Sequence, residues 1–270
     1  HTALYAQDGA TMRLEGTVVG FNRASIEDYP SSGIYVTGST TSFEMIGGMI
    51  ENNVGTGFIC AHKSKCILAS VIVKYNTYRG AVVSEAYIYV KSSVFEHNGV
   101  GDKVNSGAGI GCWGSANAKA ICNISNTIFR YNKASMANHA SSYGGGGLQA
   151  SGNVNVYIYG SSFIFNEAKD KGNEIKSNPS GGKIPTVTMV NVHFANPDSA
   201  HRFGGACNVS HMNGVLCNKD HEDCGYCGTQ TCASNPCTVF PFTGKCTNRT
   251  GNLGVVCDYG EEAICYPGDF

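Results

Sequence analysis

The sequence of this 270-residue chain predicts an all-β fold: a parallel β-helix solenoid of about seven coils, followed by a small disulfide-rich C-terminal module. Three observations predict this fold. A short phrase ending in Asn recurs along the first 200 positions, and a Gly that leads an apolar stretch recurs between its copies. Nine of the 13 cysteines lie after position 206.

The recurring phrase reads SVFEHNG at 93–99 and TIFRYNK at 127–133. Aligned on the final Asn, its copies end at Asn22, Asn53, Asn76, Asn98, Asn132, Asn166 and Asn196. Successive copies are 22 to 34 residues apart. A phrase repeated at this spacing is typical of stacked structural repeats.

The second marker divides each repeat into two arcs. It is a Gly at the start of an apolar stretch: Gly33, Gly57, Gly80, Gly109 and Gly147. From each Gly to the next Asn the chain runs 18 to 23 residues, whereas from each Asn to the next Gly it runs 4 to 15. One arc is nearly constant in length and insertions collect in the other, as in a solenoid with variable loops.

Each coil is predicted to consist of short strands. The repeats are rich in Val, Ile, Thr, Tyr and Phe, and Gly and Asn interrupt them every few residues. Apolar residues at helical spacing are hard to find before position 200. A coil of about 20 residues accommodates two or three strands stacked in parallel on the next coil at about 4.8 Å.

Stacking explains the phrase position by position. Three positions before the Asn we expect an inward-facing apolar file: Val19, Ile50, Val73, Phe95, Phe129, Phe163 and His193. Two positions before it the charge alternates, as an exposed ladder requires: Glu51, Lys74, Glu96 and Arg130. One position before it three rings are expected to stack: Tyr75, His97 and Tyr131. Each Asn is expected to bond the backbone or the next Asn, because an unpaired buried amide costs roughly 1–3 kcal/mol.

Four cysteines within the repeats predict two disulfides. Cys60 and Cys112 each follow a marker Gly by three residues, and Cys66 and Cys122 each precede a marker Asn by ten. The two pairs therefore occupy the same place in coils about 10 Å apart, which is too far for a bridge between coils. We expect Cys60–Cys66 and Cys112–Cys122, each contributing about 2–3 kcal/mol. Reduced cysteines in a cytosolic protein are the alternative.

The pattern changes at the C-terminal end, so we expect the solenoid over 1–203 and a separate module over 204–270. The Asn phrase stops there, and nine cysteines follow: Cys207, Cys217, Cys224, Cys227, Cys232, Cys237, Cys246, Cys257 and Cys265. Disulfides are expected among them. The alternative is a metal site in HEDCGYC at 221–227, since C-x-x-C suits zinc; no metal or other cofactor is predicted. Nine is odd, so at least one tail cysteine is expected to be free, to bridge to another subunit, or to pair beyond the visible ends.

The composition of the chain limits which partners and which cellular compartment can be expected. The net charge is −1, with no basic stripe for phosphates and no apolar run of about 18 residues, so neither a nucleic-acid partner nor a membrane span is predicted. The cysteines indicate an extracellular or cell-surface protein, and three sequons predict covalent glycans: Asn123, Asn208 and Asn248. The start HTALYAQDG, without Met, is expected of a mature form or a fragment.

Two stretches carry a family resemblance. SSVFEHNG and NTIFRYNKASMANHASSYGGGGLQA resemble right-handed parallel β-helix proteins of the pectate-lyase-like superfamily, and more closely the F-x-x-N repeats of polymorphic outer-membrane and adhesin-type proteins. The resemblance covers roughly residues 1–203 and implies a right-handed β-helix. It does not imply one function, because such helices serve lyases, hydrolases, adhesins and fibres. The tail resembles an EGF-like module, from whose standard spacing it departs.

No catalytic residue is predicted. In the enzymes of the superfamily, the resemblance implies acidic residues around calcium or the phrases NTD, DD and GHG, and none of these three phrases occurs. Paired catalytic carboxylates lie about 5–10 Å apart. Glu51 and Glu96 come nearest to this arrangement, but Lys74 separates them, as expected of a charge ladder.

Three other groups of residues could belong to a site. The acidic residues after Asn166 fit a solvated turn with Lys169 and Lys171: Glu167, Asp170 and Glu174. Trp113 is expected to pack over the Cys112–Cys122 bridge, with a sugar-stacking ring as the alternative. The long insertion that contains His139 and Tyr143 fits a plain loop, with a sugar-binding lip as the alternative.

These features together predict an extracellular, non-enzymatic structural protein, a glycosylated building block of a surface fibre, wall or adhesin. It is expected to associate with itself or with other extracellular subunits. A polysaccharide lyase or glycoside hydrolase and a carbohydrate-binding module are the alternatives.

Overall fold

The structure, a computed structural model, describes residues 2–22, 32–100, 107–135, 144–168 and 173–195 with their side chains. Beyond them it describes the backbone of five short strands, β24 to β28. These described residues form strands and turns and contain no helix. Accordingly, this part of the chain has no helix that is long and apolar enough to cross a membrane.

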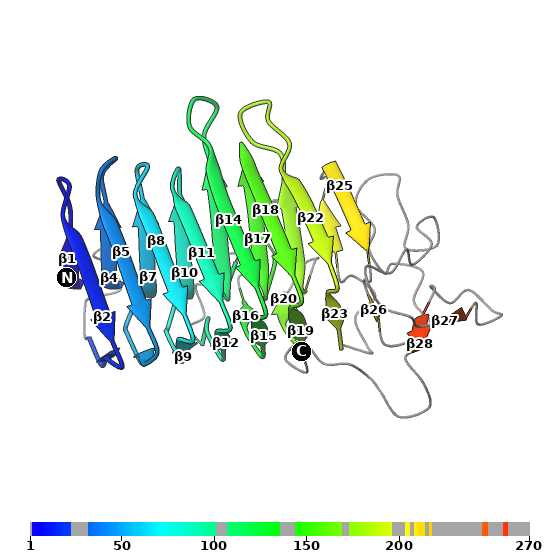
Figure 1. The fold of residues 1–270 in the computed structure, drawn as a ribbon, viewed down its shortest axis with the longest axis horizontal. Helices are drawn as coiled ribbons and strands as arrows, with labels where there is room; N and C mark the ends of the chain where they lie inside the picture. The colour runs from blue at the N-terminus through cyan, green and yellow to red at the C-terminus, as the bar shows by residue number, and fades with distance from the viewer. Residues whose placement is uncertain are drawn as a thin grey trace.

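Three parallel sheets of eight strands each run along the molecule (Figure 1). Sheet A comprises β1 (Thr2–Ala6), β4 (Ser32–Thr37), β7 (Thr56–Ala61), β10 (Arg79–Ser84), β13 (Ile110–Gly114), β17 (Leu148–Gly152), β21 (Ile175–Asn178) and β24 (Phe203–Gly205). Sheet B comprises β2 (Thr11–Glu15), β5 (Ser42–Ile46), β8 (Lys65–Ala69), β11 (Tyr87–Lys91), β14 (Ala120–Ser125), β18 (Val154–Tyr159), β22 (Thr186–Val190) and β25 (Asn208–Asn213). Sheet C comprises β3 (Val18–Gly20), β6 (Met49–Glu51), β9 (Ile72–Lys74), β12 (Val94–Glu96), β15 (Ile128–Arg130), β19 (Ser162–Ile164), β23 (His193–Phe194) and β26 (Leu216–Cys217).

The chain visits the sheets in the order A, B, C and then returns to A beside the strand that it left. One such passage is termed a coil, and stacked coils of this kind make the molecule solenoid-like, compatible with a parallel β-helix. Two small pairs complete the strands: the parallel pair of β16 (Lys133–Ala134) with β20 (Glu167–Ala168), and the antiparallel pair of β27 (Lys245–Thr247) with β28 (Val256–Asp258).

The solenoid encloses a continuous apolar core because side chains alternate between the two faces of a strand. In β14, for example, every second residue is buried. Phenylalanines of sheet C stack along this core with ring centroids 4.8 to 5.3 Å apart: Phe95, Phe129, Phe163 and Phe194. All four are fully buried, and burying such a side chain contributes roughly 1.5–3 kcal/mol.

The last coil that is described with its side chains corrects one prediction. Strand β23 pairs His193 with Ser162 and Phe194 with Phe163. Phe194 therefore continues the apolar file, and the placement of His193 in that file is wrong by one residue. A shift of one residue exchanges the two faces of a strand, and the larger apolar side chain, Phe194, takes the position in the core. Asn196 lies outside the described residues.

The marker Gly recurs because neighbouring coils approach each other closely there. A Cβ atom at Gly57 would lie 2.7 Å from the carbonyl oxygen of Gly80 and 2.8 Å from Nδ2 of Asn76. Any side chain would force these two coils apart. The Gly and the Asn therefore recur together, as two parts of one contact.

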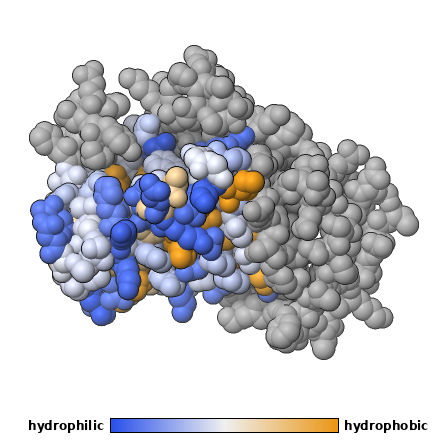
Figure 2. Space-filling model, turned by 90° about the horizontal axis from the view of Figure 1, so that it is seen from above, coloured by the Kyte–Doolittle hydropathy of each residue, from blue (hydrophilic) through white to orange (hydrophobic). Residues whose placement is uncertain are grey.

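The turns from sheet A to sheet B lie along one edge of the solenoid, at the top of Figure 1. Figure 2 shows this side from above, with hydrophilic residues over most of the described surface and apolar patches between them. Two of these turns are longer than the others, 115–119 and 179–185. Added length is thus accommodated at this edge without a break in the sheets.

Candidate functional site

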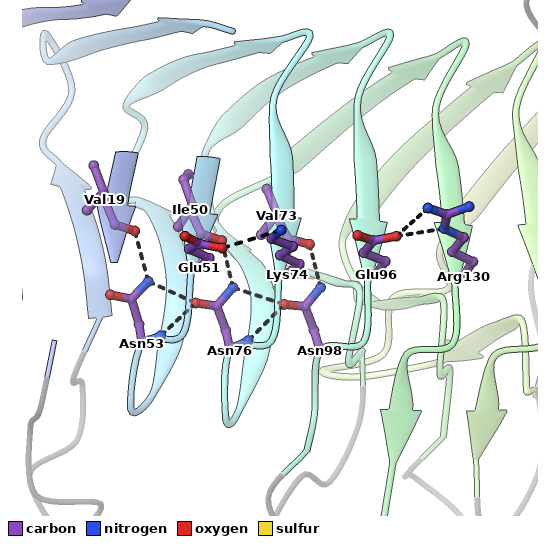
Figure 3. A network of polar contacts seen from close by, with 10 residues as sticks. All are labelled: Val19, Ile50, Glu51, Asn53, Val73, Lys74, Asn76, Glu96, Asn98 and Arg130. Carbon is purple, nitrogen blue, oxygen red and sulfur yellow. Dashed lines mark hydrogen bonds and ion pairs between the residues drawn. The ribbon is translucent and has the colours of Figure 1, made fainter. Parts of the chain in front are cut away.

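Six asparagines lie one above another where the chain leaves sheet C, and they form the asparagine file: Asn22, Asn53, Asn76, Asn98, Asn132 and Asn166. Figure 3 shows the repeating unit. Nδ2 of Asn76 donates to Oδ1 of Asn98 at 2.9 Å and to the carbonyl of Ile50 at 3.1 Å. Oδ1 of Asn76 accepts from Nδ2 of Asn53 at 2.8 Å and from the Asn53 backbone N–H at 3.2 Å. Each fully buried amide is therefore paired on both sides, as the repeated phrase predicts.

Glu174 ends the asparagine file. Nδ2 of Asn166 donates to Oε2 of Glu174 at 2.6 Å, and the Glu174 side chain is fully buried. The interpretation of Glu174 as part of a solvated turn is wrong, because the fold brings it back beneath Asn166, where a carboxylate takes the place of the next carboxamide oxygen. Glu167 is exposed and pairs with Lys133 at 3.0 Å; Asp170 lies outside the described residues.

The residue before each Asn has a left-handed backbone. Its φ lies between 50° and 59° at Phe21, Asn52, Tyr75, His97, Tyr131 and Phe165. This conformation costs roughly 1–2 kcal/mol for a residue with a side chain. It turns the side chains outward, and rings on successive coils stack at 5.1 Å (Tyr75–His97), 5.1 Å (His97–Tyr131) and 5.9 Å (Tyr131–Phe165). The first two contacts are the predicted ones, whereas Phe165 and the left-handed backbone were not predicted.

The charge ladder is paired two by two (Figure 3). Lys74 Nζ lies 3.4 Å from Glu51, and Arg130 lies 2.6 Å from Glu96, to which its Nε also donates at 2.7 Å. The strand register places each of the four residues directly opposite the next one in the row. Each carboxylate is engaged by a cation, so the ladder is built to join coils.

A second buried polar file was not predicted. Ser93, Thr127 and Ser161 each donate a hydroxyl hydrogen bond to the carbonyl two residues earlier, at 2.8 to 2.9 Å. The same oxygens accept backbone N–H groups from the coil before, for example from Val71 to Ser93 at 3.1 Å. The sequence signal is a hydroxyl residue five positions before the Asn, at Asn98, Asn132 and Asn166.

The structure contains the two disulfides that the cysteine spacing predicts, Cys60–Cys66 and Cys112–Cys122. All four cysteines are fully buried in the core. Val83 lies in register between Cys60 and Cys112, and Ile88 lies between Cys66 and Cys122. Each bridge therefore lies within one coil and joins sheet A to sheet B. Disulfides of this kind are typical of an oxidising, extracellular-type environment.

Trp113 corrects a further prediction. Cys112 points into the core, so its neighbour Trp113 points away from it, onto the outer face of sheet A. There it packs beside an apolar cluster that includes Ile59 and Val82. The expectation that the ring packs over the Cys112–Cys122 bridge is wrong, because the sheet separates them.

Neighbouring groups hold the Trp113 ring in place. Nε1 donates to Oε1 of Gln149 at 3.3 Å, and the guanidinium of Arg79 lies 5.0 Å from the ring centroid. A Cβ atom at Gly111 would lie 2.9 Å from the ring, so this position must lack a side chain. The result is a half-buried, pre-oriented aromatic group beside polar side chains, an arrangement that suits binding of a ligand with both apolar and hydroxyl surfaces.

Other predicted site residues are described by backbone alone or lie outside the described residues. Asn208 begins β25, Cys217 ends β26, and Cys246 lies opposite Cys257 in the β27–β28 pair. The remaining predictions fall outside: Cys207, Cys224, Cys227, Cys232, Cys237, Cys265, Asn248, His139 and Tyr143. No three His, Cys, Asp or Glu side chains within the described ranges are grouped to bind a metal, and the HEDCGYC segment lies outside those ranges.

Comparison with protein-family models, with curated proteins and with solved structures finds no match for this chain. The solenoid is therefore defined by the pairing of its own strands.

Proposed function

We propose that this chain is an extracellular, non-enzymatic structural protein, a glycosylated building block of a surface fibre, wall or adhesin. Its solenoid is proposed to be a right-handed parallel β-helix of about seven coils over residues 1–203. Residues 204–270 are proposed to form an EGF-like, disulfide-bonded module that joins it to other subunits.

The observation that carries the proposal is the asparagine file. Five of its six amides are fully buried, and hydrogen bonds link each to its neighbour from Asn22 to Asn166, where Glu174 ends the file. Side-chain hydrogen bonds thus reinforce the backbone ladder along the length of the solenoid. Buried polar side chains that link each coil to the next support a mechanical role.

Two further features support the compartment. Both described disulfides lie in the core, and three sequons occur in the sequence. Disulfides persist in oxidising compartments, and N-linked glycans are added along the secretory route. An extracellular rod stabilised inside its coils fits both features.

The test is the assembly state of the full chain secreted from a eukaryotic host. We expect elongated, concentration-dependent assemblies by sedimentation and electron microscopy, with intermolecular disulfides on non-reducing gels. A strictly monomeric particle at high concentration, without such disulfides, would contradict the building-block function. Release of new reducing ends or unsaturated products from a panel of polysaccharides would contradict the non-enzymatic part.

The position of Trp113 supports a second candidate, carbohydrate binding on the outer face of sheet A. The ring is half-buried and held by Gln149 and Arg79 on that face. Glycan-array binding by the wild-type protein that Trp113→Ala abolishes would favour this candidate. Tyr89→Ala, which removes a ring from the outer face of sheet B, is the control and should leave such binding unchanged.

A further inference from the structure

The outer face of sheet B changes character along the solenoid. In its first two strands this face is charged, because it carries Arg13, Glu15 and Glu44. The pKa of the Arg13 guanidinium is raised by its hydrogen bond with Glu15 and then by the charges of Glu15 and Glu44. Further along, one register row runs from β8 to β18 through Ile67, Tyr89, Asn123 and Tyr157. Ile67 is 38% exposed and Tyr89 is 52% exposed. Apolar side chains exposed in one row on the outer face of a sheet form a contact surface or an aggregation hazard unless something covers them.

Asn123 lies in the middle of this row and faces outward. The buried residues of β14 are Ala120, Cys122 and Ile124. The first and third residues of the sequon, Asn123 and Ser125, therefore share the outer face of sheet B. Within the described part of the chain, the Asn123 carboxamide makes no hydrogen bond. On the next strand, Nδ2 of Asn155 donates to the Tyr157 hydroxyl at 3.1 Å.

We propose that Asn123 carries an N-linked oligosaccharide that lies along this row and covers the rings of Tyr89 and Tyr157. The inference rests on the extracellular function proposed above and gives one of its sequons a location and a role. The two tyrosines flank Asn123 on the neighbouring strands, about 4.8 Å away on either side. A sugar on Nδ2 is therefore within reach of both rings, each of which offers an apolar face and a hydroxyl.

The glycan would keep two solenoids from packing through sheet B. A bulky hydrophilic group at the centre of the apolar row separates opposing faces. Assembly is then directed to other surfaces, such as the ends of the solenoid or the cysteine-rich module. The charged first strands of the same sheet have less apolar surface to cover.

The first experiment maps the glycan on the full chain secreted from a eukaryotic host. Enzymatic deglycosylation in heavy-oxygen water, followed by peptide mass spectrometry, marks each occupied Asn. We expect Asn123 to be marked in the wild-type protein, and Ser125→Ala to lose the mass of one glycan. Ser125→Thr preserves the sequon on the same strand and should retain the glycan.

The second experiment tests the coverage with a tyrosine-nitrating reagent. Removal of the glycan from the folded wild-type protein is expected to raise nitration of Tyr89 about threefold or more, because the shield is lost. Tyr75 and Tyr131, 42% and 43% exposed on another part of the surface, are the internal reference and should not change. Because the enzyme acts on folded wild-type protein, the result does not depend on the folding of a variant.

Two outcomes would overturn the inference: an unoccupied Asn123 in the secreted, folded protein, or an occupied Asn123 whose glycan leaves Tyr89 labelling unchanged. Neither outcome affects the proposed building-block function if assemblies still form. Conversely, a glycosylated Asn123 on a strictly monomeric protein would contradict the building-block function and leave this inference intact.

Discussion

A single buried asparagine illustrates the energetics of this fold at the residue scale. The residue before it adopts a left-handed backbone at a cost of roughly 1–2 kcal/mol. The Asn that follows forms several buried hydrogen bonds, each worth roughly 0.5–1.5 kcal/mol net. These hydrogen bonds offset the cost of the turn, which explains why Asn recurs at this position in the coils from Asn22 to Asn166.

Substitution of Asn98 by Ala is expected to be strongly destabilising. It removes the acceptor of Asn76 Nδ2 and the donor to the Val73 carbonyl and to Asn132. Several buried polar groups then lose partners, so we expect the free energy of unfolding to fall by about 2–5 kcal/mol in urea titrations followed by circular dichroism.

The matched control for that experiment is Asn123→Ala in protein that carries no glycan. Asn123 lies on the outer face of a strand, so its replacement should change the free energy of unfolding by about 0.5 kcal/mol or less. Equal effects of the two substitutions would contradict the energetic role of the asparagine file.

At the scale of strands and coils, register determines which side chains meet. Cys60 and Cys66 in one coil, and Cys112 and Cys122 in another, share positions with Val83 and Ile88 in the coil between them. The same two core positions thus accept either a bridge or two apolar side chains. The charge ladder follows the same rule on the outside, where each charge meets its opposite on the next strand.

The double substitution Cys60→Val with Cys66→Ile uses this equivalence. It removes the covalent link and keeps core positions filled as in the neighbouring coil. We expect a loss of about 2–3 kcal/mol from loop entropy, offset in part by the added apolar surface. The control is the double variant Cys60→Ser with Cys66→Ser, which lacks both the bridge and the apolar side chains and should be less stable still. Urea unfolding of the two double variants separates the contribution of the bridge from that of the packing. A double serine variant as stable as the wild type would refute both contributions.

Reversal of one charge tests the ladder. Glu96→Lys would place a cation between Lys74 and Arg130 on the adjoining strands. The pair is partly exposed to solvent, so we expect a loss of about 1 kcal/mol that high salt reduces by screening. Glu96→Gln should cost less, and a loss independent of salt would indicate packing instead of charge.

At the scale of the whole molecule, stability is distributed over contacts between neighbouring coils, because each coil meets only the next. The files of core rings, asparagines and hydroxyls cross these interfaces at fixed places. Between those places the turns vary in length, as the loops at 115–119 and 179–185 show at the upper edge in Figure 1. Insertions are therefore tolerated or disruptive according to where they fall on the coil.

A Gly-Ser insertion after Ala116 should be tolerated. This residue is exposed in the turn between β13 and β14, and lengthening a surface loop costs about 1 kcal/mol or less. The same insertion between Tyr131 and Asn132 separates the ring stack from the asparagine file, and we expect loss of cooperative thermal unfolding. Similar melting curves for the two variants would contradict a solenoid held together by these files.

Much of the fold and of the site can be predicted from local repetition. Asn76, Asn98 and Asn132 share a phrase, and Cys60–Cys66 and Cys112–Cys122 share distances from its markers, so equivalent residues can be aligned without coordinates. The same alignment could also have predicted the hydroxyl file of Ser93, Thr127 and Ser161. The prediction for the coil at His193 is wrong because a phrase that ends in Asn does not reveal a shift of one residue, and the packing of Phe194 against Phe163 decides that shift.

The sequence alone predicts that the chain repeats, where its coils stack and how the four cysteines of the repeats pair, because stacking requires like residues at like positions. The direction of each side chain and the partners that a distant segment supplies follow only from the packing of the folded chain. Trp113 lies on the opposite side of the sheet from the bridge beside it in sequence, and Glu174 is buried beneath Asn166 instead of being solvated. Both depend on how the chain returns through space after a loop of variable length, and nothing in the repeated phrase encodes that return.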